Sequence, residues 1–180
     1  MIDAQPVVLV TGISASGKST VAELLAQRFE RGVHVKGDVF RRMVVSGRAE
    51  MSASPSADGW DQLRLRYRLG AATADAYHAA GFSVVVQDVV VGQVLDEYVA
   101  AIRSRPRFVV VLAPRPDVVE AREAGRAKVA YRDGAPTVDA LDHALRHETP
   151  RLGLWLDSSD QRPDETVEEI IERADEARVE

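Results

Sequence analysis

The segment from Gly12 to Ser19 has residue types and a spacing that suit phosphate binding. Its sequence, GISASGKS, matches the pattern G-x-x-x-x-G-K-[ST] at every fixed position. Glycine permits backbone conformations and close approaches that a Cβ would block, so backbone N–H groups can converge on phosphates. Lys18 is expected to reach the β- and γ-phosphates, and the Ser19 hydroxyl to coordinate Mg²⁺. A glycine-rich turn with an incidental lysine is the alternative.

These features predict binding of a nucleotide through its phosphates, together with Mg²⁺. The residues expected to bind the nucleotide are Gly12, Ser14, Ala15, Ser16, Gly17, Lys18, Ser19 and Thr20. The segment follows an apolar, strand-like run and opens a helical pattern, which is the context that this motif requires. A GTPase is not expected, because no base-reading N-K-x-D motif occurs in the sequence.

Two aspartates end strand-like runs further along the chain. Asp38 ends VHVKGD and Asp88 ends SVVVQD. Functional groups gather beyond the carboxyl ends of parallel strands, where the phosphate-binding segment also begins. We expect Asp38 to orient or deprotonate an acceptor hydroxyl, and Asp88 to hold Mg²⁺, to bind the acceptor or to be the base itself. A helix N-cap for Asp38 and a strand-end turn for Asp88 are the alternatives.

Arginines follow the fourth strand-like run. Arg122 and Arg126 are four residues apart and therefore share one face of a helix. Because phosphoryl transfer needs positive charge that closes over the phosphate, we expect both arginines to act from a lid over residues 122–136. The alternative is a solvated charged helix with Glu120 and Glu123 as partners.

Other candidates flank a long Ser-rich stretch, residues 46–59. The residues that are expected to line an acceptor pocket there are Arg41, Arg42, Arg64, Arg66, Tyr67 and Arg68. Trp60 is expected to stack on a ring-bearing acceptor, with packing at the start of its own helix as the alternative.

The elements that must position these residues alternate along the chain. Apolar, mostly valine-rich runs predict strands over 7–11, 33–36, 82–87, 108–113 and 154–157. Amphipathic stretches predict helices over 18–30, 39–46, 60–80, 93–103, 117–128, 137–148 and 164–177. This alternation predicts an α/β fold with one parallel sheet that is covered on both faces.

Length and composition limit the classes of protein. A chain of 180 residues is near the usual size of one domain, so we expect a single domain over 1–180. The net charge of −5 disfavours a nucleic-acid partner, and the lack of cysteine excludes disulfides and thiolate chemistry. No apolar run approaches ~20 residues, so no membrane partner is expected. A soluble, cytoplasmic monomer or homodimer is the expectation.

With these residues placed, the chain resembles the P-loop kinase superfamily, in the group of shikimate kinase, gluconate kinase and chloramphenicol phosphotransferase. Asp38 stands where the last family has its base. The segment Asp88-Val-Val-Val-Gly92 is similar to its acidic-apolar-glycine element, and Arg122-Glu123 to its Arg-Glu element before the lid. The resemblance implies a three-layer αβα fold with a five-stranded parallel sheet in the order 2-3-1-4-5. It also implies adenine contacts near Asp157.

The function implied by the resemblance is ATP-dependent transfer of the γ-phosphate to a small-molecule hydroxyl. The acceptors that the resemblance leaves open are an antibiotic, a nucleoside-like natural product and a metabolite. An antibiotic acceptor would imply a role in antibiotic resistance. A substrate-binding helical insert would cover about residues 39–80. The alternatives are a nucleotide kinase, in which arginines near 41, 42 and 64 would hold an acceptor phosphate, and a nucleotide-binding regulatory ATPase.

Overall fold

A central sheet organises the computed structural model, which describes residues 5–125 and 135–180. Its parallel strands are β1 (Val7–Gly12), β2 (Gly32–Lys36), β3 (Ser83–Gln87), β4 (Arg107–Leu112) and β5 (Leu154–Leu156). They pair in the order β2-β3-β1-β4-β5. The predicted α/β class and the predicted strand order are both confirmed. Arg126, one of the two arginines expected in the lid, lies outside the described residues.

One strand of the sheet was not predicted. The segment β6 (Arg178–Val179) pairs antiparallel with β4, so the sheet of the described chain has six strands and is not wholly parallel. The space for it exists because β5 is short and pairs with β4 only at Val110 to Leu112. That leaves the first residues of β4 open on one edge, where β6 binds. A two-residue strand has no apolar period that a sequence pattern could detect.

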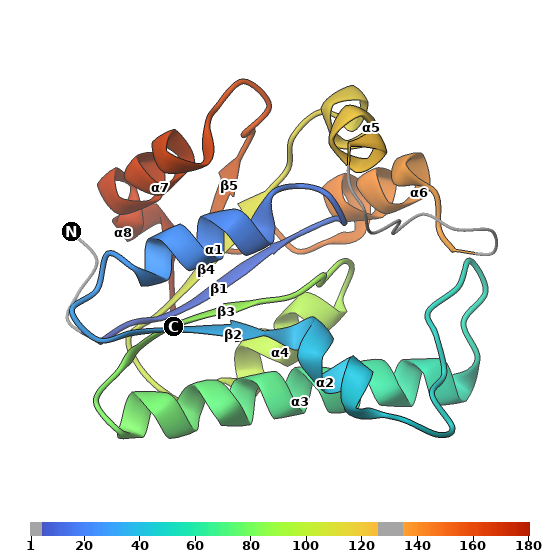
Figure 1. Cartoon of the computed structure of the whole chain (residues 1–180), viewed down its shortest axis with the longest axis horizontal. Coiled ribbons are helices and arrows are strands. Elements are labelled where there is room, and N and C mark those ends of the chain that lie inside the picture. Colours follow the sequence, from blue (N-terminus) through green and yellow to red (C-terminus); the bar gives the residue numbers. More distant parts are fainter. Residues whose placement is uncertain (1–4, 126–134) are drawn as a thin grey trace.

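Helices cover both faces of the sheet, as Figure 1 shows. The helix α1 (Lys18–Ala26), with α7 (Pro163–Glu172) and α8 (Ala174–Ala177), lies on one face. The opposite face carries α3 (Ala57–Ala79) and α4 (Val94–Ala101). The other helices lie towards the carboxyl ends of the strands and are α2 (Gly37–Met43), α5 (Pro116–Ala124), α6 (Val138–His143) and the π-helical turn η1 (Ala144–Glu148).

Several predicted helix limits were wrong, each for a local reason. The helix predicted from Trp60 begins at Ala57, because the Ser56 side chain accepts a hydrogen bond from the Gly59 N–H and caps it. The helix predicted over 137–148 changes at Ala144 from α to π geometry. The helix predicted over 164–177 is interrupted at Arg173, between α7 and α8.

The core has two layers because successive side chains of a strand point to opposite faces. In β1, Val7 and Leu9 pack in the cluster under α3 and α4. Val8 and Val10 pack in the cluster under α1 and α7. All four side chains are fully buried, which explains why the run is continuously apolar rather than alternating.

The carboxyl ends of the strands meet at one edge of this sheet. The loop after β1 leads into α1, β2 leads into α2 and β3 is followed directly by Asp88. The predicted phosphate-binding segment and both predicted aspartates therefore lie at the same edge. Within the described ranges, we find no helix with the length and apolar character needed to cross a membrane.

Candidate active site

The loop between β1 and α1 adopts the shape that its glycines permit. Gly12 has a φ of 144° and Gly17, which caps the N-terminus of α1, has a φ of 96°. A Cβ on Gly12 would lie 2.4 Å from the Leu112 carbonyl oxygen, so only glycine fits there. Ala15 also has a positive φ, of 63°. The loop thus curls over the start of a nine-residue helix, whose free N–H groups and dipole favour a bound anion.

Lys18 folds back over this loop. Its Nζ donates a hydrogen bond of 2.6 Å to the Ile13 carbonyl oxygen. The loop and the first turn of α1 line part of a large cleft. The lining residues that they supply are Ser14, Ala15, Gly17, Lys18, Ser19 and Thr20. Gly12 and Ser16 are buried and do not belong to that lining. Six of the eight predicted nucleotide-binding residues are therefore brought to one surface.

The cleft has a volume of about 1990 Å³. A pocket for one drug-sized ligand is usually ~300–1,000 Å³, so this cleft has room for a nucleotide and a second molecule. We call its wall at residues 14–20 and Arg122 the nucleotide end. We call its wall at α2, residues 44–56 and the first half of α3 the acceptor end.

Asp88 lies in this cleft and is only 4% exposed. Its Oδ1 accepts a hydrogen bond from the Val89 N–H at 2.7 Å and forms an ion pair with Arg66 Nη2 at 2.8 Å. Its buried Oδ2 has no hydrogen-bond partner among the described residues. Burial raises the pKa of the Asp88 carboxyl, and the charge of Arg66 opposes that shift. The Asp88 side chain thus bonds the next backbone N–H, as its alternative role supposes, and it also has a guanidinium partner that was not predicted.

A glycine makes room for the Asp88 carboxylate. A Cβ on Gly37 would lie 2.0 Å from Asp88 Oδ2. Gly37 is the residue before Asp38, and β2 and β3 are neighbours in the sheet. This packing brings the Asp38 and Asp88 segments together, and both side chains line the cleft with Lys18. The structure thus brings these groups together at the sheet edge.

Asp38 is held by arginines of its own helix. Arg41 Nε lies 3.1 Å from Oδ1 and Arg42 Nε lies 3.2 Å from Oδ2. The N-cap position of α2 is Lys36, and Asp38 lies within the first turn. The alternative that Asp38 is an N-cap is therefore wrong. The side chain is 30% exposed, so an acceptor in the cleft can reach it.

Arg122 reaches from α5 to the nucleotide end. Its Nη1 donates to the Ser16 carbonyl oxygen at 3.4 Å, and its Nη2 to the Ser158 carbonyl oxygen at 2.9 Å. It thus contacts both the phosphate-binding loop and the turn after β5. In that turn, the exposed Asp157 accepts a hydrogen bond from the Ser159 N–H at 3.0 Å and does not line the cleft.

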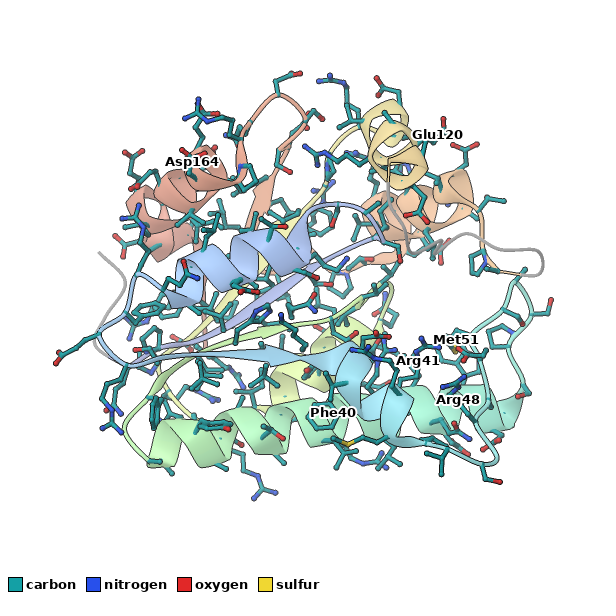
Figure 2. All side chains as sticks on the ribbon, in the orientation of Figure 1. Phe40, Arg41, Arg48, Met51, Glu120 and Asp164 are labelled. Carbon is teal, nitrogen blue, oxygen red and sulfur yellow. The ribbon has the colours of Figure 1, made fainter. Side chains whose placement is uncertain are left out.

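Ion pairs dominate the acceptor end, where Figure 2 shows Arg41, Arg48 and Met51 gathered at α2 and the loop that follows it. Arg41 Nη1 and Arg48 Nε both contact the Glu50 carboxylate. Arg64 pairs with Glu97 at 3.0 Å. Sequence patterns had not pointed to Glu50 or Glu97, because neither belongs to a motif and their partners depend on how two helices and a loop fold together.

Trp60 lies on the rim of the acceptor end. Its side chain lines the cleft and the residue is 36% exposed. The Arg64 guanidinium carbon lies 5.8 Å from the centre of the indole ring. An indole in this position can stack on a ring of a bound molecule.

The residues at the nucleotide end fit Mg²⁺ bound together with a nucleotide. Ser19 supplies a hydroxyl, and Asp88 supplies a buried carboxylate oxygen without a partner among the described residues. Mg²⁺ prefers oxygen ligands and is often held by one or two protein groups plus phosphates. Among the described residues, no group of three or more His, Asp or Glu side chains that could hold a metal ion occurs.

Comparisons with solved structures show the same fold. An unliganded sugar kinase from Janibacter sp. HTCC2649 has 21% identity and a TM-score of 0.68, with 96% of each chain covered. The tunicamycin resistance protein of Deinococcus radiodurans has 14% identity and a TM-score of 0.66, over 98% of this chain and 99% of that one. A gluconokinase from Sinorhizobium meliloti 1021 has 20% identity and a TM-score of 0.59, over 92% and 89%.

A comparison with curated proteins finds no match. The AAA domain family model AAA_33, in contrast, matches residues 7–150, from the start of β1 to beyond η1. This range contains the phosphate-binding loop, both aspartates and Arg122, and it covers well over half of the chain. The chain therefore belongs to the AAA_33 family of P-loop kinases.

Proposed function

We propose that the protein is an ATP-dependent phosphotransferase that moves the γ-phosphate to a hydroxyl group of a small molecule. The observation that carries this proposal is the arrangement of one cleft. A phosphate-binding loop and Arg122 form one end, and two carboxylates, Asp38 and Asp88, lie beside Lys18 in the same lining. Family membership and the kinases among the neighbours support nucleotide-dependent phosphotransfer.

At the nucleotide end, the chain would neutralise and orient phosphates. Backbone N–H groups of residues 14–20 and the start of α1 would hold the phosphate oxygens. Lys18 and Arg122 now donate to backbone carbonyl oxygens, which are neutral acceptors. Transfer of these donors to phosphate oxygens would form stronger, charge-assisted hydrogen bonds. Such stabilisation of the charged transition state is the main source of catalysis in phosphoryl transfer.

At the acceptor end, Asp38 would orient the acceptor hydroxyl and take its proton. As the hydroxyl oxygen bonds to the γ-phosphorus, the bond from that phosphorus to the ADP oxygen breaks, and the proton passes to the Asp38 carboxylate. Ser19 and Asp88 would hold Mg²⁺, which when bound neutralises charge on the phosphate oxygens. Arg66, through its contact with Asp88 Oδ1, would favour the ionised form of that carboxylate against the effect of burial.

The paired arginines favour a hydroxyl acceptor over a phosphate acceptor. A nucleotide kinase would need Arg41, Arg42 and Arg64 to bind a phosphate, yet each already pairs with a carboxylate.

The proposal includes a cytoplasmic location, where ATP is available, a monomer or homodimer, and no nucleic-acid or membrane partner. It also includes a single domain over residues 1–180, an insert over about 39–80 and a lid over about 122–136. Arg126 belongs to the proposed lid but lies outside the described residues.

A coupled ADP-release screen over alcohols, antibiotics, nucleosides and sugar acids tests this function. We expect at least one acceptor to raise ADP release above the rate with water alone, and Lys18→Ala to abolish the increase. Lys36→Ala is the matched control, because Lys36 lies outside the cleft lining and pairs with Glu23. If ATP binds but no acceptor stimulates ADP release, the kinase proposal fails and a regulatory ATPase becomes the better explanation.

A further inference from the structure

The arginines of the acceptor end are already neutralised by carboxylates of the same chain. Within the described residues, each arginine that lines this end forms an ion pair: Arg41 and Arg42 with Asp38, Arg41 and Arg48 with Glu50, Arg64 with Glu97, and Arg66 with Asp88. Asp61 and Glu148 add two more carboxylates to the lining of the cleft. An anionic acceptor would therefore meet carboxylates as well as arginines, and it would have to share each guanidinium with a carboxylate that is already in place.

Glu50 is the residue that occupies two of these arginines at once. Its Oε2 contacts Arg41 Nη1, and its Oε1 lies 2.9 Å from Arg48 Nε. A carboxylate between two guanidinium groups occupies the position in which a carboxylate or phosphate of a ligand would bind. Without Glu50, Arg48 would lose this partner and Arg41 would keep only Asp38.

The segment that carries Glu50 is fastened to α3. Gln62 Nε2 donates to the Gly47 carbonyl oxygen at 2.8 Å, and Gln62 Oε1 accepts from the Ala49 N–H at 3.0 Å. These two bonds hold the backbone immediately before Glu50. The backbone from which the Glu50 side chain reaches Arg41 and Arg48 is therefore held in place by α3.

The same wall offers apolar surface for an uncharged molecule. Trp60 exposes part of its indole to the cleft, and Val44, Met51, Pro55 and Leu63 also line it. Contact with an aromatic ring and aliphatic side chains rewards a ligand with an apolar face, because burial removes that surface from water.

We propose that the acceptor is an uncharged hydroxyl compound with an apolar ring face that lies against Trp60, and that Glu50 excludes anionic acceptors. This proposal rests on the proposed phosphotransferase function. It makes Glu50 a specificity-determining residue: its carboxylate repels a second anion and keeps Arg41 and Arg48 occupied. Removal of its charge converts the acceptor end into an anion-binding surface.

Binding can be read from Trp60 alone. Trp60 and Trp155 are the two tryptophans of the sequence, so Trp155→Phe leaves Trp60 as the fluorescent reporter. The probes are matched pairs that differ by one charged group: uridine and uridine 5′-monophosphate, and benzyl alcohol and benzoate. Each is titrated into the protein saturated with Mg²⁺ and a non-hydrolysable ATP analogue. We expect a ring-bearing neutral member to change the Trp60 emission and to bind at least about tenfold more tightly than its anionic partner.

The Glu50→Gln variant gives the decisive comparison. It should bind the anionic member of that pair at least about tenfold more tightly than the parent protein does, with a change below about twofold for the neutral member. Glu172→Gln, which removes the same charge from an exposed residue of α7 outside the cleft, should change neither. A circular dichroism melt confirms that both variants are folded.

Three results would overturn the proposal. The first is tighter binding of the anionic members by the parent protein, which would mean that a ligand anion displaces Glu50. The second is no gain of anion binding in Glu50→Gln. The third is no response of Trp60 to any ring-bearing neutral probe. Failure of the phosphotransferase function is detected separately, as ATP binding without any acceptor that raises ADP release above the rate with water alone.

Discussion

The two ends of the cleft satisfy their cationic side chains in different ways. At the nucleotide end, Lys18 and Arg122 direct their donors to backbone carbonyl oxygens. At the acceptor end, arginines such as Arg41 and Arg64 direct theirs to carboxylates. A carbonyl oxygen satisfies the geometry of a hydrogen bond without cancelling the charge, whereas a carboxylate cancels it. This difference supports the proposal that the nucleotide end binds an anion and the acceptor end a neutral molecule.

This difference shows that counting basic residues in a cleft does not predict its ligand. Both ends contain positive side chains, and a sequence pattern treats them alike. What separates them is the partner that the fold supplies to each. An ion pair within the protein makes its arginine less able to bind an anionic ligand, because the ligand must compete with a carboxylate that is already in place.

The largest expected effect comes from removing the Arg122 guanidinium. We expect Arg122→Ala to lower the turnover number about 10²- to 10³-fold, because a donor aimed at phosphate oxygens in the transition state is lost. The measurement is steady-state ADP release. Arg115→Ala is the matched control, since Arg115 is an exposed arginine next to the same helix and pairs with Asp160. Equal, small losses in both variants would show that the nucleotide end does not depend on Arg122.

Asp38→Asn tests the other end of the cleft. We expect a turnover number about 10²-fold lower with little change in nucleotide affinity, because an amide orients a hydroxyl but cannot accept its proton. Asp88→Asn is expected instead to weaken the dependence of nucleotide binding on Mg²⁺. Near-normal turnover in Asp38→Asn would assign Asp38 to acceptor binding alone and make Asp88 the remaining candidate for the base.

Gly37→Ala tests the junction where the two ends meet. The new methyl group would fall 2.0 Å from Asp88 Oδ2, and that buried carboxylate would have to move. We expect a loss of about 2 kcal/mol in the free energy of unfolding, as for other overpacked sites, together with lower activity. Denaturant unfolding measures the first quantity. Gly125→Ala, whose added Cβ makes only ordinary contacts beyond 3.7 Å, should be close to neutral.

The smallest effect concerns the strand that carries Asp38 to the cleft. The His34 side chain on β2 is 8% exposed, and burial lowers the pKa of His34 from its usual 6.5 to about 4. The unfolded chain therefore binds this proton at a higher pH than the folded chain, and acid favours unfolding. Its stabilising contribution is complete above pH ~6.5 and is lost as the pH falls towards ~4.

Between pH 7 and pH 6 we expect a loss of about 0.7 kcal/mol in the free energy of unfolding from this residue, measured by denaturant titration. His34→Leu should remove that part of the pH dependence, because both ring nitrogens lack a hydrogen-bond partner among the described residues. An unchanged pH dependence in His34→Leu would assign it to other groups. The affinities of the two cleft ends should not change in this variant.

Much of the fold was predictable because its signals are local. The valine-rich run of β1 must be buried on both faces, and the glycines at 12 and 17 suit the turn that follows it. The strand order came from the resemblance and is confirmed. The strand β6 was missed because it exists only where the short β5 leaves β4 open. No local sequence pattern indicates that this edge of β4 is open.

The sequence by itself determined the phosphate-binding loop and the class of fold, because both depend on residues that are adjacent in the chain. Only the tertiary structure decided which charges remain for a ligand. Arg66 meets Asp88 across 22 residues, Arg64 meets Glu97 across 33, and Glu50 receives Arg41 because Gln62 of another helix fastens its loop. Charge cancellation depends on distance in space, and the spacing of residues along the chain does not contain that distance.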